Sequence, residues 1–183
     1  MTYSKRSLFQ ASILLVLLLV FVTPSFARLS VKVTASEVGD ICSKTKNPSF
    51  CVAVLKSTPG TGTADLPGLT KITLDLARSN ATNTQNLIKS LIPKATEPRL
   101  KESYTSCSEH YDGVLGDFDD ADQDLKVSDP ASLNIHTSAA LDEAGNCEDE
   151  LEGLGPDPSV VKGSLDLQSI CSIVLVISNL LRQ

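Results

Sequence analysis

Two long stretches in the middle of the chain place apolar residues at every third or fourth position. The first stretch covers residues 100–125 and the second covers residues 133–154, with Cys107 and Cys147 on their apolar positions. This spacing puts the apolar side chains on one face of a helix, so it predicts two long helices facing a shared core. Asp129 and Pro130 separate them, because proline disfavours a helical residue before it.

Two further segments show the same helical period. Residues 66–92 carry Leu69, Ile72, Leu76, Asn83, Leu87 and Leu91 on one predicted face, and Pro93 ends the helix. Residues 164–181 form the last predicted helix, after a linker of glycine and proline at residues 153–158. Its centre, residues 170–177, is apolar nearly all round but short for a membrane span of about 20 residues. We therefore expect this helix to be buried among the others.

The residues before this bundle predict a smaller helical unit. Residues 33–57 read as two short helices around a turn at residues 45–48. The predicted fold is thus all-α: an up-and-down four-helix bundle at residues 64–183, with an N-terminal helical hairpin at residues 28–60.

The first 27 residues are typical of a secretory signal peptide. Lys5 and Arg6 precede an apolar run at residues 8–22, and a small-x-small ending leads to Ala27. A membrane anchor is the alternative, but the run is short for a bilayer. Cleavage after Ala27 would leave residues 28–183 as the secreted domain, without a membrane segment and more acidic than the precursor.

The five cysteines all follow this leader, and export makes disulfides the expected state. Two bridges can be drawn among five cysteines in many ways, so the count alone leaves the pairing open. Helix geometry favours Cys107–Cys147 on neighbouring antiparallel helices and Cys42–Cys51 across the short hairpin. Cys171 then remains as a buried free thiol. No spacing of Cys and His resembles a metal site.

Composition argues against nucleic-acid binding and catalysis. The net charge is -6 and only 4% of residues are aromatic, whereas nucleic-acid binding needs cationic and stacking side chains. No glycine-rich nucleotide motif or nucleophile elbow is present, so we expect no cofactor. His110 and His136 are interpreted as half-buried or exposed side chains without a catalytic task.

Two local motifs remain. Residues 117–124 carry five aspartates, but the position that needs glycine in a calcium loop is Leu125, and the helical period continues through the run. This favours a solvated acidic helix face over a cation site, with a partner-facing surface as a further alternative. Asn80 begins a glycosylation sequon, yet it lies about 20° from Leu69 and Leu87 on a helical wheel, so its occupancy stays open.

Four blocks of sequence resemble the plant invertase and pectin methylesterase inhibitor family. They read ICSKTKNPSFC at residues 41–51, YTSCSEHY at 104–111, SAALDEAGNCED at 138–149 and IVLVISNLL at 173–181. The resemblance covers the whole secreted part and implies a non-catalytic protein with a four-helix bundle, a hairpin and the two bridges named above. Invertase inhibitors typically carry Pro-Lys-Phe before the helix of the fourth cysteine, where this chain has DPAS at residues 129–132.

The resemblance therefore favours an apoplastic inhibitor of pectin methylesterase that forms a 1:1 complex and covers the pectin-binding cleft. The alternatives are an invertase inhibitor and an acidic extracellular binding module without inhibitory activity. The resemblance also implies an interface around the third and fourth cysteines, made by Glu109, Asp112, Gly113, Gly116, Asn146 and Asp149. Glycine replaces two acidic residues of the family at positions 113 and 116, and asparagine replaces the usual threonine at 146, which places potency in question.

Overall fold

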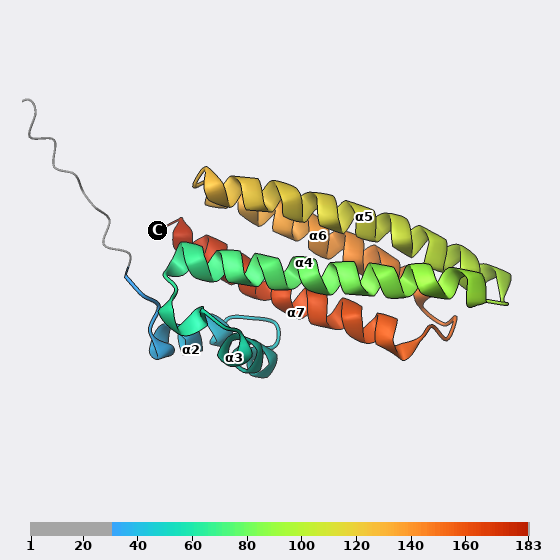
Figure 1. Ribbon diagram of the computed structural model, residues 1–183, viewed down its shortest axis with the longest axis horizontal. Helices are drawn as coiled ribbons and strands as arrows, with labels where there is room; N and C mark the ends of the chain where they lie inside the picture. The colour runs from blue at the N-terminus through green and yellow to red at the C-terminus, as the bar shows by residue number, and fades with distance from the viewer. Residues whose placement is uncertain (1–30, 183) are drawn as a thin grey trace, which may run out of the picture. The chain divides into compact units, whose positions relative to one another are not determined.

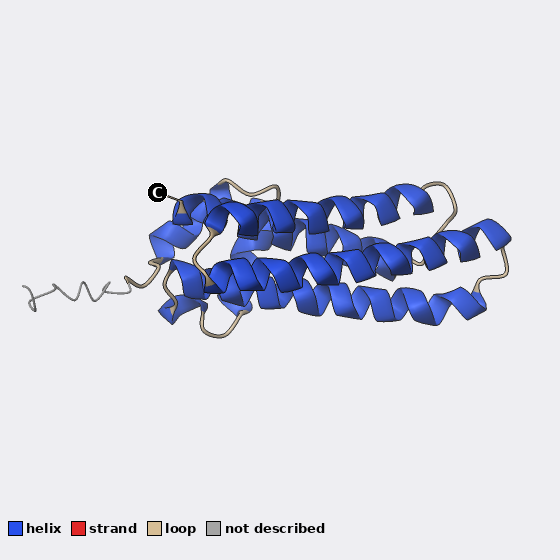
Figure 2. Ribbon diagram, turned by 90° about the horizontal axis from the view of Figure 1, so that it is seen from above, coloured by secondary structure: helices blue, strands red, loops and turns tan. Residues whose placement is uncertain are grey.

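The computed structural model describes residues 31–182, which form helices and turns without a strand (Figure 2). The predicted signal peptide lies outside these residues. The helices are α2 (Ala35–Ser43), α3 (Pro48–Ser57), α4 (Leu66–Leu91), α5 (Pro98–Lys126), α6 (Pro130–Leu151) and α7 (Pro158–Leu181). Two short 3-10 turns, η1 (Thr61–Thr63) and η2 (Ile92–Lys94), lie on either side of α4.

Most of these helices begin with the same local signal. A polar residue caps the helix, its side-chain oxygen accepts a backbone N–H of the first turn, and proline occupies the first or second helical position. The caps of this kind are Asn47, Asp65, Glu97, Asp129 and Asp157. Proline suits the first turn because its φ is already helical and its missing N–H needs no partner there.

The last helix begins six residues earlier than predicted. Asp157 and Pro158 were assigned to a linker, but Asp157 accepts the N–H of Ser159 at 2.8 Å and starts α7 at Pro158. At the other end of that loop, α6 stops at Leu151, so the predicted position Leu154 lies beyond the helix.

Helices α4 to α7 make an up-and-down bundle, which confirms the predicted fold class (Figures 1 and 2). Helix α5 packs against α4 and α6, and α7 packs against the same two helices from the other side. The chain therefore passes round the bundle in sequence order, as short connections require.

The helices α2 and α3 pack together and contact the bundle through α7 (Figure 1). Ile41 and Leu55 share an apolar cluster with Leu69 of α4 and with Ile173 and Ile177 of α7. The turn between α2 and α3 is fixed as well, because the Lys46 backbone N–H donates to Ser172 Oγ at 2.8 Å.

The buried face of α5 is the predicted one, whereas that of α4 is rotated. Leu69 is buried as expected, but Ile72, Leu76, Leu87 and Leu91 are only partly buried and Asn83 is exposed. The side chains that α4 buries instead are mainly small or polar: Thr70, Thr73, Leu74, Ala77, Ala81, Thr84, Gln85 and Ile88. Small residues let α4 approach both neighbours closely, while four of the apolar side chains predicted for the core lie along the edges of those contacts.

Helix α7 is long and apolar enough to cross a membrane by length and composition. Its Leu167, Ile170, Val174 and Ile177 are nevertheless buried in the bundle core. The expectation of a helix packed among the others is confirmed, and the apolar composition of α7 is explained by its two neighbours and by the α2–α3 pair.

Candidate functional site

Two disulfides join the helix pairs that contain the four cysteines expected to be bridged. Cys42–Cys51 joins α2 to α3 with a Cα–Cα distance of 5.4 Å, and Cys107–Cys147 joins α5 to α6 at 4.6 Å. These are the expected pairs. Cys171 is a buried free thiol, and burial raises its pKa to about 12.

The structure exposes all six residues of the expected interface but spreads them over a wide surface. Glu109, Gly113 and Gly116 lie on α5, and Asn146 lies on the neighbouring α6. A Cβ atom built on Gly113 would stand 3.5 Å from the Glu143 side chain, so Gly113 borders the contact between the two helices. We call the exposed surface formed by Glu109, Gly113, Gly116 and Asn146 the α5–α6 face.

Asp112 and Asp149 point away from the α5–α6 face. Asp112 accepts from Gln85 Nε2 at 2.6 Å and lies 3.6 Å from Lys89 Nζ, which turns it toward α4. Asp149 lies on the last turn of α6, beside a cavity of about 360 Å³ between α6 and α7 whose walls include Leu151, Val160 and Glu152. The predicted residues therefore form a face with a carboxylate on either flank, and they do not converge on one pocket.

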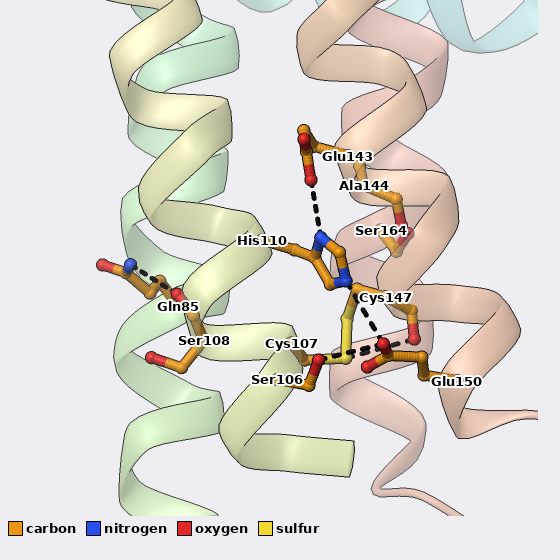
Figure 3. A network of polar contacts seen from close by, with 10 residues as sticks. All are labelled: Gln85, Ser106, Cys107, Ser108, His110, Glu143, Ala144, Cys147, Glu150 and Ser164. Carbon is orange, nitrogen blue, oxygen red and sulfur yellow. Dashed lines mark hydrogen bonds and ion pairs between the residues drawn. A yellow bond between two sulfur atoms is a disulfide. The ribbon is translucent and has the colours of Figure 1, made fainter.

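The contact between α5 and α6 contains a row of titratable side chains that the sequence analysis did not anticipate. His110 of α5 places Nδ1 2.5 Å from Glu143 Oε2 and Nε2 3.3 Å from Glu150 Oε1, so its ring bridges two carboxylates of α6 (Figure 3). His136 of α6 makes the reciprocal contact, with Nδ1 2.6 Å from Asp124 Oδ2 of α5. We call this row the α5–α6 seam: Glu150, His110, Glu143, Asp117, His136, Asp120 and Asp124.

The pKa values of both histidines are raised. For His110, burial lowers the pKa, but the hydrogen bonds and the negative charges of Glu143 and Glu150 together outweigh that effect. For His136, the hydrogen bond to Asp124 is the main cause of the rise. The interpretation of these histidines as side chains without a catalytic task stays a prediction, but each is part of an ion pair between helices.

The sequence contained a signal for this pairing. When a disulfide joins Cys107 and Cys147 on antiparallel helices, a residue that follows Cys107 lies beside the residue that precedes Cys147 by about the same number of positions. This register brings His110 next to Glu143 and, further along, His136 next to the aspartates of α5. The apolar period alone carries no such information.

The acidic run at residues 117–124 is helical, as predicted, but it is not simply solvated. Asp119 accepts from Arg78 Nη1 at 2.6 Å, and Asp122 lies 2.7 Å from Lys126 Nζ and 3.5 Å from Lys71 Nζ. The bond to Lys126 lowers the pKa of Asp122, while burial raises that of Asp117. Among residues 31–182, no three His, Cys, Asp or Glu side chains are grouped to hold a metal ion.

The sequon residue Asn80 lies half-buried on α4. Its Oδ1 is enclosed and has no hydrogen-bond partner within the described part of the chain. A glycan is attached to the amide nitrogen of asparagine, so the burial of this oxygen does not decide whether Asn80 is modified. Glycosylation at Asn80 stays a prediction.

Comparison with known proteins matches residues 25–177 to the family described as "Plant invertase/pectin methylesterase inhibitor". The chain is 44% identical over 181 residues to a pectinesterase inhibitor of Actinidia deliciosa, covering 98% of this chain and 96% of that protein. It is 42% identical to pectinesterase inhibitor 2 of Arabidopsis thaliana, covering 83% and 88%. A crystal structure of a mutant Arabidopsis pectin methylesterase inhibitor superposes with a TM-score of 0.74 at 39% identity, over 78% of this chain and 95% of that one.

Proposed function

Because the chain belongs to the plant invertase/pectin methylesterase inhibitor family, we propose that it is a secreted inhibitor of pectin methylesterase. The chain is not an enzyme, since the family and these relatives are inhibitors. The observation that carries the proposal is the similarity to the Actinidia pectinesterase inhibitor along almost the entire chain. The leader at residues 1–27 supports delivery to the cell wall, where pectin is found.

The proposed mode of action is steric, in a 1:1 complex that covers the pectin-binding cleft of the enzyme. The α5–α6 face supports it as the contact surface, because it is exposed, polar and held rigidly by the Cys107–Cys147 bridge at one end. Polar and charged groups at such an interface contribute specificity and association rate by matching groups on the partner. The flanking carboxylates of Asp112 and Asp149 extend this surface toward α4 and α7.

Inhibition of invertase is the second candidate within the family. The stretch DPAS at residues 129–132 supplies the cap and first turn of α6 and lacks the lysine and phenylalanine typical of invertase inhibitors. This difference and the pectinesterase inhibitors among the relatives favour pectin methylesterase as the target. A non-inhibitory acidic binding module is the alternative of another class.

The direct test is methanol release from pectin by a plant pectin methylesterase titrated with the secreted domain. We expect activity to fall linearly with added protein to an end point near one inhibitor per enzyme. Full activity at excess protein would refute the proposal, and loss of sucrose hydrolysis in a parallel invertase assay would favour the second candidate. If neither enzyme is inhibited, the binding-module alternative gains support.

A double variant tests the assigned surface. Glu109→Ala with Asp149→Ala removes two exposed carboxylates near the third and fourth cysteines, and we expect weaker inhibition with unchanged helicity. The matched control is Asp40→Ala with Asp75→Ala, which removes the same charge from exposed positions on α2 and α4. Equal affinity of the first variant and the native protein would show that the interface lies elsewhere.

A further inference from the structure

Helix α5 forms ion pairs with both α4 and α6, but the cationic side chains in the two contacts differ. Toward α4, the ion pairs use lysine and arginine: Lys71–Asp122 at 3.5 Å, Arg78–Asp119 at 2.6 Å and Lys89–Asp112 at 3.6 Å. Toward α6, the ion pairs recorded for residues 31–182 all use histidine. The chain has two histidines in total, and both lie in this one contact.

The arrangement of the two histidines is reciprocal. His110 extends from α5 to carboxylates of α6, and His136 extends from α6 to a carboxylate of α5. Asp117 lies between them, where it interacts electrostatically with both His136 and Glu143. The α5–α6 seam is therefore a continuous row in which five carboxylates share two imidazoles.

We propose that the α5–α6 seam stabilises the packing of α5 against α6 in a pH-dependent way. Its contribution is large when His110 and His136 are protonated and small when they are neutral. With both rings charged, each imidazolium attracts carboxylates on the opposite helix. With both rings neutral, five carboxylates remain along the row without a cation, and like charges at this spacing repel one another. The proposal concerns the stability of the helix pair and does not depend on the identity of the inhibited enzyme.

The other charged groups around the seam do not replace the histidines. On the α4 side of α5, Lys71, Arg78 and Lys89 are engaged with the aspartates named above. On the α7 side of α6, Glu148 accepts from the neutral Gln168, and Arg182 acts on Asp129 at the start of α6. The groups that act on His136 are Asp124, Asp120 and Asp117, and those that act on His110 are Glu143 and Glu150.

The direction of the effect follows from proton linkage. A histidine whose pKa is raised by folding stabilises the folded state fully below its unfolded pKa of about 6.5, and this stabilisation disappears as the pH rises through the folded pKa. The side chain of His110 is 23% exposed and that of His136 is 33% exposed, so solvent screens part of the attraction. Both ends of the helix pair are joined covalently, by Cys107–Cys147 and by the turn at residues 127–129, so the seam weakens without the helices separating.

The experiment is urea unfolding of the secreted domain, with its disulfides intact, at about pH 5.5 and about pH 8, on either side of the histidine range. We expect the unfolding midpoint to fall at the higher pH. In His110→Gln with His136→Gln this fall should be lost, and the variant should match the native protein most closely at the higher pH. Arg78→Gln is the control from the α4 side: it should shift the midpoint equally at both pH values and keep the fall.

A measurement on the native chain guards against a variant that fails to fold. The Cε1 protons of the two histidines can be titrated by NMR, and we expect both midpoints above the usual value of about 6.5. A midpoint of urea unfolding that is the same at both pH values would overturn the proposal. So would a pH-dependent fall that persists in the double variant, or two histidines that titrate at or below the ordinary value.

Discussion

Tyr104 and Tyr111 lie on the same buried face of α5, but their hydroxyl groups meet different surroundings. Tyr104 Oη accepts the backbone N–H of Asp157 at 2.8 Å, and Asp157 is the cap of α7. Tyr111 Oη is buried near the hydroxyls of Thr84 and Ser164 without a well-formed hydrogen bond to either, and burial raises its pKa to about 12. One hydroxyl therefore stabilises a helix start, whereas the other is desolvated without a well-formed hydrogen bond.

Replacing each tyrosine by phenylalanine separates these two cases while the ring is kept. We expect Tyr104→Phe to lower the free energy of unfolding by about 1 kcal/mol, because the N–H of Asp157 loses its partner. Tyr111→Phe should be neutral or raise stability by up to about 1 kcal/mol, because it removes an unpaired buried polar group. Urea unfolding of both variants checks the order, and a greater loss in Tyr111→Phe would mean that its hydroxyl has a partner such as a buried water.

The sequence predicted the burial of both tyrosines but not the difference between them. The apolar period places a residue on a helix face, and that information is local. The partner of Tyr104 lies 53 residues away at the start of another helix. The same reason explains why His110 and His136 were assigned no partner: their carboxylates are known only once α5 and α6 are aligned.

At the scale of helices, the closest recorded approach at a glycine is between α4 and α7. A Cβ atom on Gly163 would lie 2.3 Å from Oγ1 and 3.0 Å from Cγ2 of Thr84, a side chain that is only 4% exposed. Thr84 has little room to turn away in a packed core. The glycine is thus required by the distance between the helices, although glycine lowers the intrinsic helix propensity.

We expect Gly163→Ala to destabilise the fold by about 1–3 kcal/mol through overpacking. The loss should be smaller when Thr84→Ala is already present, because the obstructing atoms are then gone. Gly116→Ala is the matched control: nothing lies within 4 Å of its added Cβ, so better helix propensity should stabilise by up to about 1 kcal/mol. Thermal or urea unfolding of the four variants gives these differences, and equal effects of the two glycine substitutions would contradict the close approach.

The close contact between α4 and its neighbours also explains which buried helix faces could be predicted from the sequence. On α5 and α6 the buried residues are those of the apolar period, aromatic side chains on α5 and mainly small ones such as Ala140 and Ala144 on α6, so their period gave the correct face. On α4, threonine and alanine fill much of the core, and a pattern based on leucine and isoleucine points largely to the wrong side. The start of α7 was missed because aspartate followed by proline occurs both in loops and at helix caps, and only the backbone distinguishes them.

Across the whole molecule, the two disulfides hold structures of different size. Cys107–Cys147 closes a loop with a sequence separation of 40 between two long helices of the bundle, whereas Cys42–Cys51 closes one of 9 within the α2–α3 pair. Cys171 is no threat to either bridge in the folded state, because burial raises its pKa to about 12 and exchange requires a thiolate. Each bridge can therefore be removed by itself without reshuffling of the other in the folded state.

Removal of each disulfide should lower the free energy of unfolding by a different amount and should affect a different part of the molecule. Chain entropy gives a loss of about 3.9 kcal/mol for Cys107→Ala with Cys147→Ala and about 2.7 kcal/mol for Cys42→Ala with Cys51→Ala. Alanine is chosen because all four cysteines are buried and a serine hydroxyl would be left without a partner. Urea unfolding of both double variants gives the ranking, and the reverse order would show that native packing around the bridges outweighs loop length.

The helices that each removal affects can be inferred from how the α2–α3 pair contacts the bundle. It contacts the bundle mainly through α7, while α4 to α7 hold one another on two sides each. Without Cys42–Cys51, we expect amide exchange to become faster in α2 and α3 and to stay unchanged in α4 to α6. Without Cys107–Cys147, exchange should accelerate throughout the bundle, because α5 and α6 belong to its shared core. Uniform acceleration in both variants would instead mean that hairpin and bundle unfold as a single cooperative unit.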